Sequence, residues 1–234
     1  MRILAVAAHP DDLEQLCGGT LARFAREGHE VTACHLARGD RGSFLHDREE
    51  IAAIREQESL AAARILGAVH VSMGLSDGEV NSADPVQKDL AVDLIRSARP
   101  DLIITHHPAD YMVDHVETGR LIEDASFVAT LPLYLTPHPA NIVVPAVYYM
   151  DTLAGLGFSP AEYVDITTTV DTKLAALAEH GSQLEWLRDH DGVDVLEQTR
   201  TVSAFRGFQS GVAHAEGFIP SLRWLRVRTE RMLP

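Results

Sequence analysis

The chain has 234 residues with 34 acidic and 20 basic side chains, which give a formal net charge of −14 at pH 7. That charge disfavours nucleic acid and anionic membrane surfaces as partners. The only cysteines, Cys17 and Cys34, are too few for a disulfide framework or a cysteine-based zinc module. The sequence has no signal-peptide pattern and no apolar run near the roughly 20 residues of a membrane span. We therefore expect one cytoplasmic domain over residues 1–234, which is compatible with a homo-oligomer.

Strand and helix patterns alternate through the first two thirds of the chain. Apolar runs predict strands over 3–8, 31–37, 69–73 and 101–106, and helical patterns cover 13–27, 48–66, 86–98 and 114–129. Asp47 and Glu50 resemble a capping box for the second helix, which Gly67 would end. This alternation is typical of right-handed βαβ units. It predicts an α/β, Rossmann-like three-layer fold with a mostly parallel, twisted sheet.

The pattern is weaker beyond Pro132. Short strands are predicted over 147–150 and 163–166, and helices over 170–180 and 194–205. Lys173, at the start of one of these helices, is predicted to face solvent. We expect these elements to form a smaller C-terminal strand and helix portion that packs on the main sheet.

Two clusters of polar side chains follow the first and fourth predicted strands. In the common doubly wound order these strands are neighbours, and ligands bind at the carboxyl ends of the strands where the winding reverses. Residues 9–12 leave the first strand, and residues 106–115 leave the fourth. Two segments far apart in the sequence are therefore expected to meet in one crevice.

The segment after the first strand, residues 8–14, reads Ala-His-Pro-Asp-Asp-Leu-Glu. Charged groups at the end of a buried strand are costly unless they coordinate an ion or do chemistry, and a divalent metal would explain them. His9 and Asp12 supply two ligands, and the loop after the fourth strand offers a third from His106, His107 and His115. Two histidines and one carboxylate with an open position suit catalytic zinc, and they also suit Fe²⁺ or another divalent metal.

Asp11 lies between these two ligands without being one, which suits a general base for water activated by a metal. The proton would then be available for a leaving amine. The local pattern alone has a simpler interpretation, in which Asp12 caps the following helix and Glu14 favours its dipole. The second histidine cluster favours the metal interpretation, and Glu14 is expected to be structural.

On these residues the chain resembles the PIG-L/LmbE family of metal-dependent N-deacetylases, which act on N-acetylglucosamine conjugates. The family's opening motif, Ala-His-Pro-Asp-Asp-x-Glu, is complete here, and its second motif, His-Pro-Asp-His, corresponds to 112–115, which read Met-Val-Asp-His. The resemblance implies that His9, Asp12 and His115 ligate zinc. It also implies that Asp11 is the general base. Weaker likenesses follow in order at 55–58, 76–78, 180–183, 205–207 and 215–218.

The chain departs from the resembled family at Met112, where the family has a histidine that helps to stabilise the tetrahedral intermediate together with the aspartate of the motif, here Asp114. Methionine cannot donate or carry a proton, so the catalytic candidate Asp114 loses its expected partner. Another donor could substitute, the metal alone could suffice at a reduced rate, or the protein could bind without hydrolysing. A missing donor costs about 10²–10³ in rate. The candidate substitutes are Tyr111, His106, His107 and His214.

Three further side chains are candidate substrate contacts. Arg55 lies with Glu58 on an otherwise apolar helix face, so it lines the crevice, as in the resembled family, or forms a surface salt bridge. Asp77 either accepts hydrogen bonds from sugar hydroxyls or belongs to an Asp-Gly turn. His214, in a late loop, is either a structural or a catalytic histidine.

The leading interpretation is a zinc-dependent hydrolase that removes the acetyl group from an N-acetylglucosamine-type conjugate, a small-molecule substrate. The sugar comes from the resemblance and not from the composition. The alternatives are an amidase for a different amide and a metal-holding binding protein, which would have little need of Asp11. A dinucleotide-binding enzyme is disfavoured, because Gly18 and Gly19 come too late for the fingerprint and the carboxylates would repel pyrophosphate.

Overall fold

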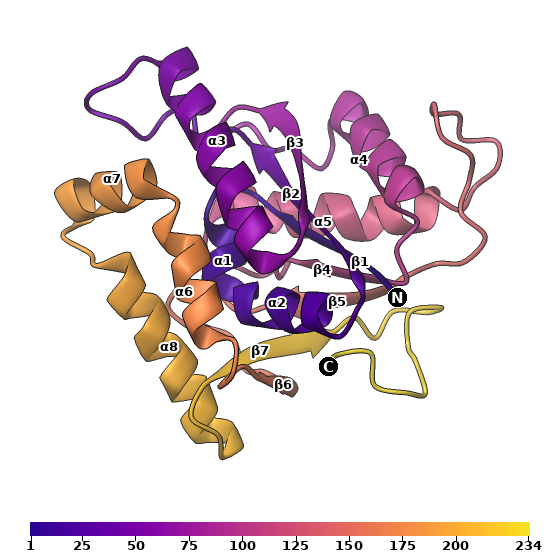
Figure 1. Ribbon diagram of the computed structural model, residues 1–234. Coiled ribbons are helices and arrows are strands. Elements are labelled where there is room, and N and C mark those ends of the chain that lie inside the picture. The colour runs from indigo at the N-terminus through magenta and orange to yellow at the C-terminus, as the bar shows by residue number, and fades with distance from the viewer.

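A computed structural model describes residues 1–234 as a single twisted sheet with helices on both faces (Figure 1). The strand order is β3-β2-β1-β4-β5-β7-β6. β1 to β5 run parallel, and β7 is antiparallel to both of its neighbours. The predicted α/β fold with a mostly parallel sheet is confirmed, and β1 lies next to β4 as predicted. The strands are β1 (Arg2–Ala7), β2 (Glu30–Ala37), β3 (Val69–Leu75), β4 (Leu102–Thr105), β5 (Ala146–Met150), β6 (Glu162–Asp165) and β7 (Ala215–Pro220).

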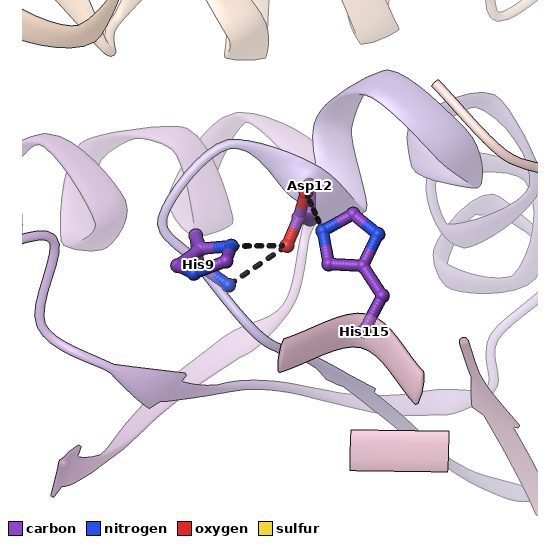
Figure 2. Close-up of side chains that lie close together, drawn as sticks. All are labelled: His9, Asp12 and His115. Carbon is purple, nitrogen blue, oxygen red and sulfur yellow. Dashed lines mark hydrogen bonds and ion pairs between the residues drawn. The ribbon is translucent and has the colours of Figure 1, made fainter. Parts of the chain in front are cut away.

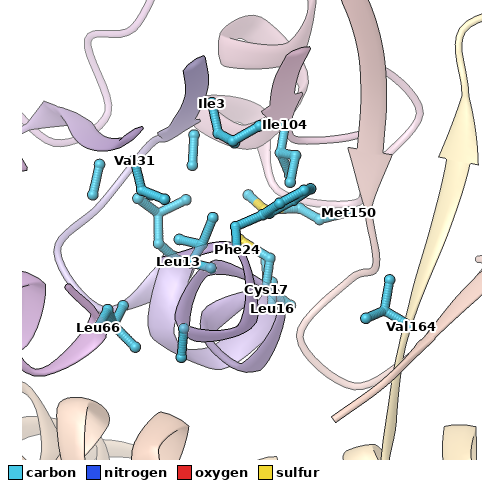
Figure 3. Close-up of a cluster of buried hydrophobic side chains, with 14 of the residues drawn as sticks. Ile3, Leu13, Leu16, Cys17, Phe24, Val31, Leu66, Ile104, Met150 and Val164 are labelled. Atoms are coloured by element: carbon cyan, nitrogen blue, oxygen red, sulfur yellow. The ribbon is translucent and has the colours of Figure 1, made fainter. Parts of the chain in front are cut away.

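The helices bury the two faces of β1 in two separate cores. Ile3 and Ala5 face a core that also contains Leu13 of α1, Phe24 of α2 and residues of α3 and α6 (Figure 3). The alternate residue Leu4 faces the other core, with α4 and α5. No helix combines the length and the apolar character that a membrane crossing requires. The helices are α1 (Asp12–Leu16), α2 (Gly18–Arg26), α3 (Arg48–Leu66), α4 (Pro85–Ala98), α5 (Val113–Val128), α6 (Val170–Ala178), α7 (Gly181–Asp191) and α8 (Val195–Ser210).

Helix α3 has the bounds that its capping residues predict. The Asp47 carboxylate accepts hydrogen bonds from the backbone N–H groups of Glu49 and Glu50, and the Glu50 side chain accepts from the backbone of Asp47. Gly67 ends the helix with a φ of 75°, a conformation that glycine adopts without a Cβ penalty. Both ends of α3 are therefore determined by local sequence.

The predicted helix over 13–27 is wrong in one respect, because it is two helices. The chain breaks at Cys17, whose φ is −144°. The backbone N–H groups of Gly19 and Thr20 donate to the Glu216 carboxylate at 2.9 and 2.7 Å. In a continuous helix these groups would bond to the preceding turn. The long-range carboxylate instead takes them as the first turn of α2.

The C-terminal portion differs most from the prediction. Helix α6 ends at Ala178, and a further helix, α7, and a strand, β7, follow where none is predicted. Lys173 does not face solvent: it is 1% exposed, and its Nζ lies 2.6 Å from Glu216 Oε1. The reason is β7 itself, which brings Glu216 into the interior beside α6 and so provides a buried partner for the ammonium group.

Candidate active site

The carboxyl ends of β1 and β4 bring His9, Asp12 and His115 together, with Asp12 between the two imidazoles (Figure 2). His9 follows β1, Asp12 begins α1 and His115 lies in the first turn of α5. Asp12 Oδ1 lies 3.2 Å from His115 Nε2, and Asp12 Oδ2 lies 3.5 Å from His9 Nδ1. One donor atom from each residue lies within 4.8 Å of the others, so this group can hold a metal ion. The predicted meeting of the two distant segments is observed.

The surroundings of His115 suit a cation. Its Nδ1 pairs with Asp110 Oδ2 at 3.1 Å, which directs Nε2 towards Asp12. Nε2 is buried and has no hydrogen-bond partner. Burial opposes the charged form of His115, yet the carboxylates of Asp12 and Asp110 raise its pKa to about 9. A negative potential and a buried ring nitrogen without a hydrogen bond coincide at this point, and a divalent cation would satisfy both.

Asp12 is held in its ionised form. Burial alone would raise its pKa, but the neighbouring imidazoles of His115 and His106 lower it well below the ordinary range. Its Oδ2 accepts the backbone N–H of His9 at 2.7 Å. The helix-cap interpretation of Asp12 is wrong, because the N-cap position of α1 is Asp11 and Asp12 is the first residue of the helix.

Two other histidines of the β4 loop occupy different places. His106 is fully buried and stacks on His115 with ring centroids 3.8 Å apart, and its Nε2 accepts the backbone N–H of Ala8 at 3.0 Å. His107 packs edge-on against Tyr149 instead. A second group of donor atoms also lies close together, His106, Asp110 and His115. In that group His106 Nε2 and both oxygens of the Asp110 carboxylate already have partners, whereas His106 Nδ1 has none.

Asp11 is buried beside the cluster in a strained backbone conformation. It is 2% exposed and has a φ of 99°, which non-glycine residues rarely adopt. Its Oδ2 accepts a hydrogen bond from Gln15 Nε2 at 3.0 Å. Burial and then the negative charge of Asp12 raise the pKa of Asp11 to about 7. A carboxylate of this basicity can accept a proton near neutral pH.

Asp114 has partners that the sequence does not reveal. Its Oδ2 lies 3.0 Å from His9 Nε2 and accepts the backbone N–H of Gly78 at 2.6 Å. Burial would raise the pKa of Asp114, but these bonds outweigh it and lower the pKa. Met112 is the residue that precedes α5, and its neighbour Tyr111 is 56% exposed. Asp114 thus contacts a predicted metal ligand and not residue 112.

Arg55 and Glu58 do not form the surface salt bridge that is one alternative for them. Arg55 is 2% exposed, and its guanidinium donates to the carbonyls of Gly39 and Gly42 at 2.7 Å each. Glu58 accepts hydrogen bonds from the backbone N–H and hydroxyl of Ser182, at the start of α7. Arg55 therefore supports the loop after β2 from beneath, and Glu58 holds α7 against α3.

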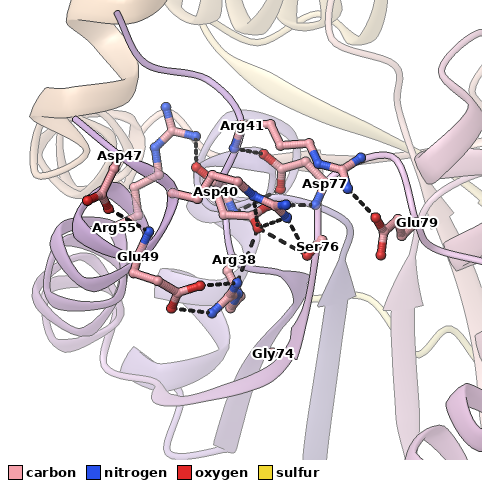
Figure 4. Close-up of polar contacts among 12 residues, drawn as sticks. Arg38, Asp40, Arg41, Asp47, Glu49, Arg55, Gly74, Ser76, Asp77 and Glu79 are labelled. Carbon is pink, nitrogen blue, oxygen red and sulfur yellow. Dashed lines mark hydrogen bonds and ion pairs between the residues drawn. The ribbon is translucent and has the colours of Figure 1, made fainter. Parts of the chain in front are cut away.

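The carboxylate of Asp77 forms hydrogen bonds with backbone groups of the loop after β2 (Figure 4). It accepts the backbone N–H groups of Gly39 and Arg41 at 2.9 and 3.2 Å. The backbone N–H of Glu79 donates to the carbonyl of Ser76 at 3.1 Å, which closes a turn around the Asp-Gly pair. These contacts agree with the turn alternative for Asp77.

His214 is not brought to the cluster. It directly precedes β7, and its backbone pairs with Ile166 and Thr167 after β6. β7 is separated from β4 by β5, and His214 is not among the residues whose donor atoms converge with those of His9, Asp12 and His115. A cavity of about 650 Å³ is also remote from the cluster, because it lies between β5, β6, β7 and the C-terminal segment.

Three neighbours of the cluster are absent from the predicted site. Asp110 orients His115, Gln15 contacts Asp11, and His180 lies with its Nε2 3.3 Å from Glu14 Oε2. Both His180 and Glu14 are fully buried, which agrees with the structural role expected for Glu14. A signal existed for Asp110, a carboxylate in the same loop as the candidate histidines. None existed for Gln15, because amides are common on helices.

Comparison with known proteins places this site in a family. A diacetylchitobiose deacetylase of Thermococcus kodakarensis is 29% identical over 94% of this chain and 84% of its own length. A conserved protein of Thermus thermophilus has a similar solved structure, with a TM-score of 0.81 and 30% identity over 99% of both chains. The fold is also shared with a 4-carboxy-2-hydroxymuconate hydratase of Pseudomonas putida, with a TM-score of 0.84 and 24% identity over 99% of this chain and 100% of the other.

The match to a family model covers more than half of the chain and includes the whole cluster. Residues 4–126 match the model described as PIG-L, GlcNAc-PI de-N-acetylase. That range contains most of β1, all of β2, β3 and β4, and the residues that meet at the carboxyl ends of β1 and β4. The chain therefore belongs to the PIG-L family.

Proposed function

We propose that residues 1–234 act as one metal-dependent N-deacetylase domain, which hydrolyses the acetamide of an N-acetylglucosamine-type conjugate. The observation that carries this proposal is the buried Nε2 of His115, which makes no hydrogen bond and faces Asp12 and His9 beside the carboxylate of Asp11. His9, Asp12 and His115 would hold the ion. Two imidazoles and one carboxylate are the donor set of many catalytic zinc sites, so zinc is the proposed metal.

A divalent ion bound by these residues would lower the pKa of a coordinated water and polarise the amide carbonyl. Asp110 would keep His115 in the tautomer that presents Nε2, because it accepts the hydrogen of Nδ1. Asp114 would do the same for His9 through Nε2 at 3.0 Å, leaving Nδ1 on the side of Asp12. Both carboxylates thus orient ligands in this proposal.

Asp11 would move the proton. It lies next to Asp12 in the chain but directs its carboxylate to Gln15. Its raised pKa of about 7 suits a group that takes a proton from water and then returns it to the departing amine nitrogen. The strained φ of 99° supports this role, because strain of this kind persists where the surrounding structure demands it and is frequent at active sites.

The oxyanion of the tetrahedral intermediate would have few protein donors. Met112 supplies none, His106 Nε2 is occupied by Ala8, and the backbone N–H of Gly78 is taken by Asp114. We infer a reduced rate and not an absence of turnover, since one missing donor costs about 10²–10³.

The substrate class rests on similarity. The family description names a GlcNAc conjugate, and the Thermococcus relative is named for diacetylchitobiose. The hydratase neighbour has a carboxylated substrate by its name. The surroundings of the cluster are strongly acidic, with Asp11, Asp12, Asp77 and Asp114, and this disfavours an anionic substrate. An amino sugar without a carboxylate fits better.

Two measurements on the purified protein test the proposal. Elemental analysis should find about one divalent metal per chain, and free amine should appear from N-acetylglucosamine or N,N′-diacetylchitobiose. Removal of the metal with a chelator should abolish amine release, and added Zn²⁺ should restore it. Bound metal without amine release from any acetamido sugar would contradict the proposed reaction and favour a metal-holding binding protein.

A further inference from the structure

Phe44, in the loop between β2 and α3, meets Trp186 of α7 in an aromatic hollow. The two elements lie on the same side of the molecule (Figure 1). The ring centroids of Phe44 and Trp186 are 4.6 Å apart, and Trp186 stacks on His190 at 4.5 Å. The ring centroids of Phe44 and His190 are 6.1 Å apart. Two rings on opposite faces of the indole would be separated by about the sum of their distances from Trp186, so Phe44 and His190 do not cover opposite faces. The hollow has a volume of about 80 Å³, and its walls include Gly42, Phe44, Leu45, Glu185, Trp186 and Asp189.

Two apolar side chains of this hollow are largely exposed. Phe44 is 69% exposed and Leu45 is 74% exposed, at the tip of their loop. α7 has no buried residue, whereas every other helix has at least two. Large apolar side chains gathered on a surface and rimmed by polar ones mark binding sites more often than chance exposure does. Helix α7 contributes little to the hydrophobic core, so burial of apolar side chains does not explain the position of α7.

The loop that carries Phe44 is held firmly at its base (Figure 4). Asp40 accepts hydrogen bonds from the Ser76 hydroxyl and from the backbone N–H of Asp77, at 3.0 Å each, and it forms an ion pair with Arg48. Arg55 donates to two carbonyls of the same loop. The exposed ring is therefore presented by a fixed support, and a ligand that meets it would pay little ordering entropy.

Hydrogen bonds connect the hollow with the metal-binding cluster through Arg55. A Cβ on Gly42 would lie 3.2 Å from Trp186 Nε1 and 3.2 Å from Arg55 Nη2, so both side chains approach the same glycine. Arg55 donates to the Gly39 carbonyl at 2.7 Å, and the backbone N–H of Gly39 donates to Asp77 at 2.9 Å. The next residue, Gly78, donates to Asp114, whose carboxylate lies 3.0 Å from His9. A chain of hydrogen bonds thus leads from the wall of the hollow to a proposed metal ligand.

The polar groups of the hollow select the chemistry of its occupant. Glu185 and Asp189 line it, with Ser182, and no lysine or arginine does. The Trp186 indole N–H has no hydrogen-bond partner and is not buried. Carboxylates and an indole N–H suit hydroxyl groups, which both donate and accept, and they repel an anion. The exposed Phe44 ring suits the apolar C–H face of a pyranose ring.

We propose that the aromatic hollow is a subsite for a neutral sugar ring attached to the sugar whose acetamide is cleaved. This inference rests on the proposed function and deepens it, because it assigns Phe44 and Trp186 to selection between substrates of different length. It favours a neutral glycoside over a phosphate-bearing conjugate.

The first test compares kcat/KM for N,N′-diacetylchitobiose with kcat/KM for N-acetylglucosamine. Phe44→Ala and Trp186→Ala should each lower this selectivity ratio about tenfold, the worth of one lost aromatic contact. Trp186→Phe should restore most of it. The matched controls are Phe208→Ala and Trp224→Ala, whose side chains are 85% and 81% exposed elsewhere on the surface, and they should leave the ratio unchanged.

A second readout is independent of hydrolysis. The chain has two tryptophans, so a Trp224→Phe protein reports on Trp186 alone. In that background, combined with Asp11→Asn to prevent turnover, N,N′-diacetylchitobiose should change the emission of Trp186 in a saturable way. Inorganic phosphate at the same concentration should not change it.

The outcomes separate this inference from the proposed function. Saturable emission changes without amine release from any sugar would refute the deacetylase and keep the subsite. Amine release with equal losses for both sugars in Phe44→Ala and Trp186→Ala, or with no emission change, would refute the subsite and keep the deacetylase. A changed mass in solution for these variants, with selectivity intact, would overturn the subsite and make the hollow an interface between two copies of the chain.

Discussion

The buried cluster around Asp12 and the aromatic hollow around Trp186 are linked by hydrogen bonds through Arg55 and the loop after β2, but they follow opposite physical rules. In the cluster, Asp12 and His115 are at most 2% exposed, and the Asp12 carboxylate lies 3.2 Å from the His115 imidazole. In the hollow, Phe44 is 69% exposed and the contacts are apolar. Changes in the cluster should therefore remove the reaction, whereas changes in the hollow should alter which substrate is used.

The largest expected effect is that of Asp11→Asn. The amide keeps the shape of the carboxylate but cannot take a proton, so kcat/KM for the acetamido sugar should fall about 10²–10⁴-fold. The metal content should not change, because Asp11 is not among the three residues that converge on the proposed ion. Amine release and elemental analysis measure the two quantities.

Asp12→Asn is the matched comparison for this prediction. It removes a proposed ligand from the same turn, so it should lose metal and activity together. If Asp11→Asn also lost its metal, the division of roles between the two neighbouring aspartates would be wrong.

A smaller effect is expected at Asp110, which contacts the proposed ligand His115 and not the ion. Asp110→Asn weakens the acceptor that fixes the His115 ring, and the affinity for Zn²⁺ should fall about 10–100-fold. Competition with a chelator measures this affinity. Asp171→Asn, exposed at the start of α6, is the control and should bind the metal like the unaltered protein. Equal affinities would show that Asp110 does not orient the ligand.

We expect Gly39→Ala to affect the cluster and the aromatic hollow together. Gly39 has a φ of 72°, and a Cβ there would lie 2.4 Å from Arg55 Cδ, so the loop and Arg55 cannot both keep their places. The positive φ alone costs about 1–2 kcal/mol of unfolding free energy, and the displacement of Arg55 adds to it.

Gly28→Ala isolates the backbone cost of this change. Gly28 has a φ of 83° and nothing within 4 Å of the added Cβ. We expect Gly39→Ala to unfold at a lower urea concentration than Gly28→Ala and, alone of the two, to lower the preference for the disaccharide. Equal effects would show that Arg55 does not couple the hollow to the cluster.

The cluster was far more predictable from sequence than the hollow. His9 and Asp12 follow an unbroken apolar strand, and strand order alone brings His115 to them. Phe44 and Trp186 lie in segments that no local pattern connects, and α7 has no buried face to give a helical period. The hollow depends on Arg55 and Glu58, whose partners are loop carbonyls and a helix start.

The same distinction holds for the fold. Buried parallel strands are apolar runs and α3 has a local cap at Asp47, so the first half was predicted closely. β7 was not, because it contains Glu216 in a buried position, together with Gly217 and Pro220. The charge of Glu216 is compensated by Lys173 and by N–H groups of α2, which are distant in sequence. Long-range compensation of this kind leaves no periodic signal.

The smallest expected effect is that of Met112→His, which introduces the histidine of the resembled family beside the cluster. Residue 112 directly precedes α5, two positions from Asp114. If an oxyanion donor is lacking, the new imidazole should preserve kcat or raise it. An ideally placed donor would raise kcat about 10²–10³-fold. We expect a smaller increase, because Asp114 already binds His9 and Gly78. Amine release under saturating sugar measures kcat. Met112→Leu, of similar volume and without a proton to donate, is the control. A large fall with histidine but not with leucine would mean that residue 112 requires an apolar side chain, and that the cluster stabilises the intermediate without a donor at this position.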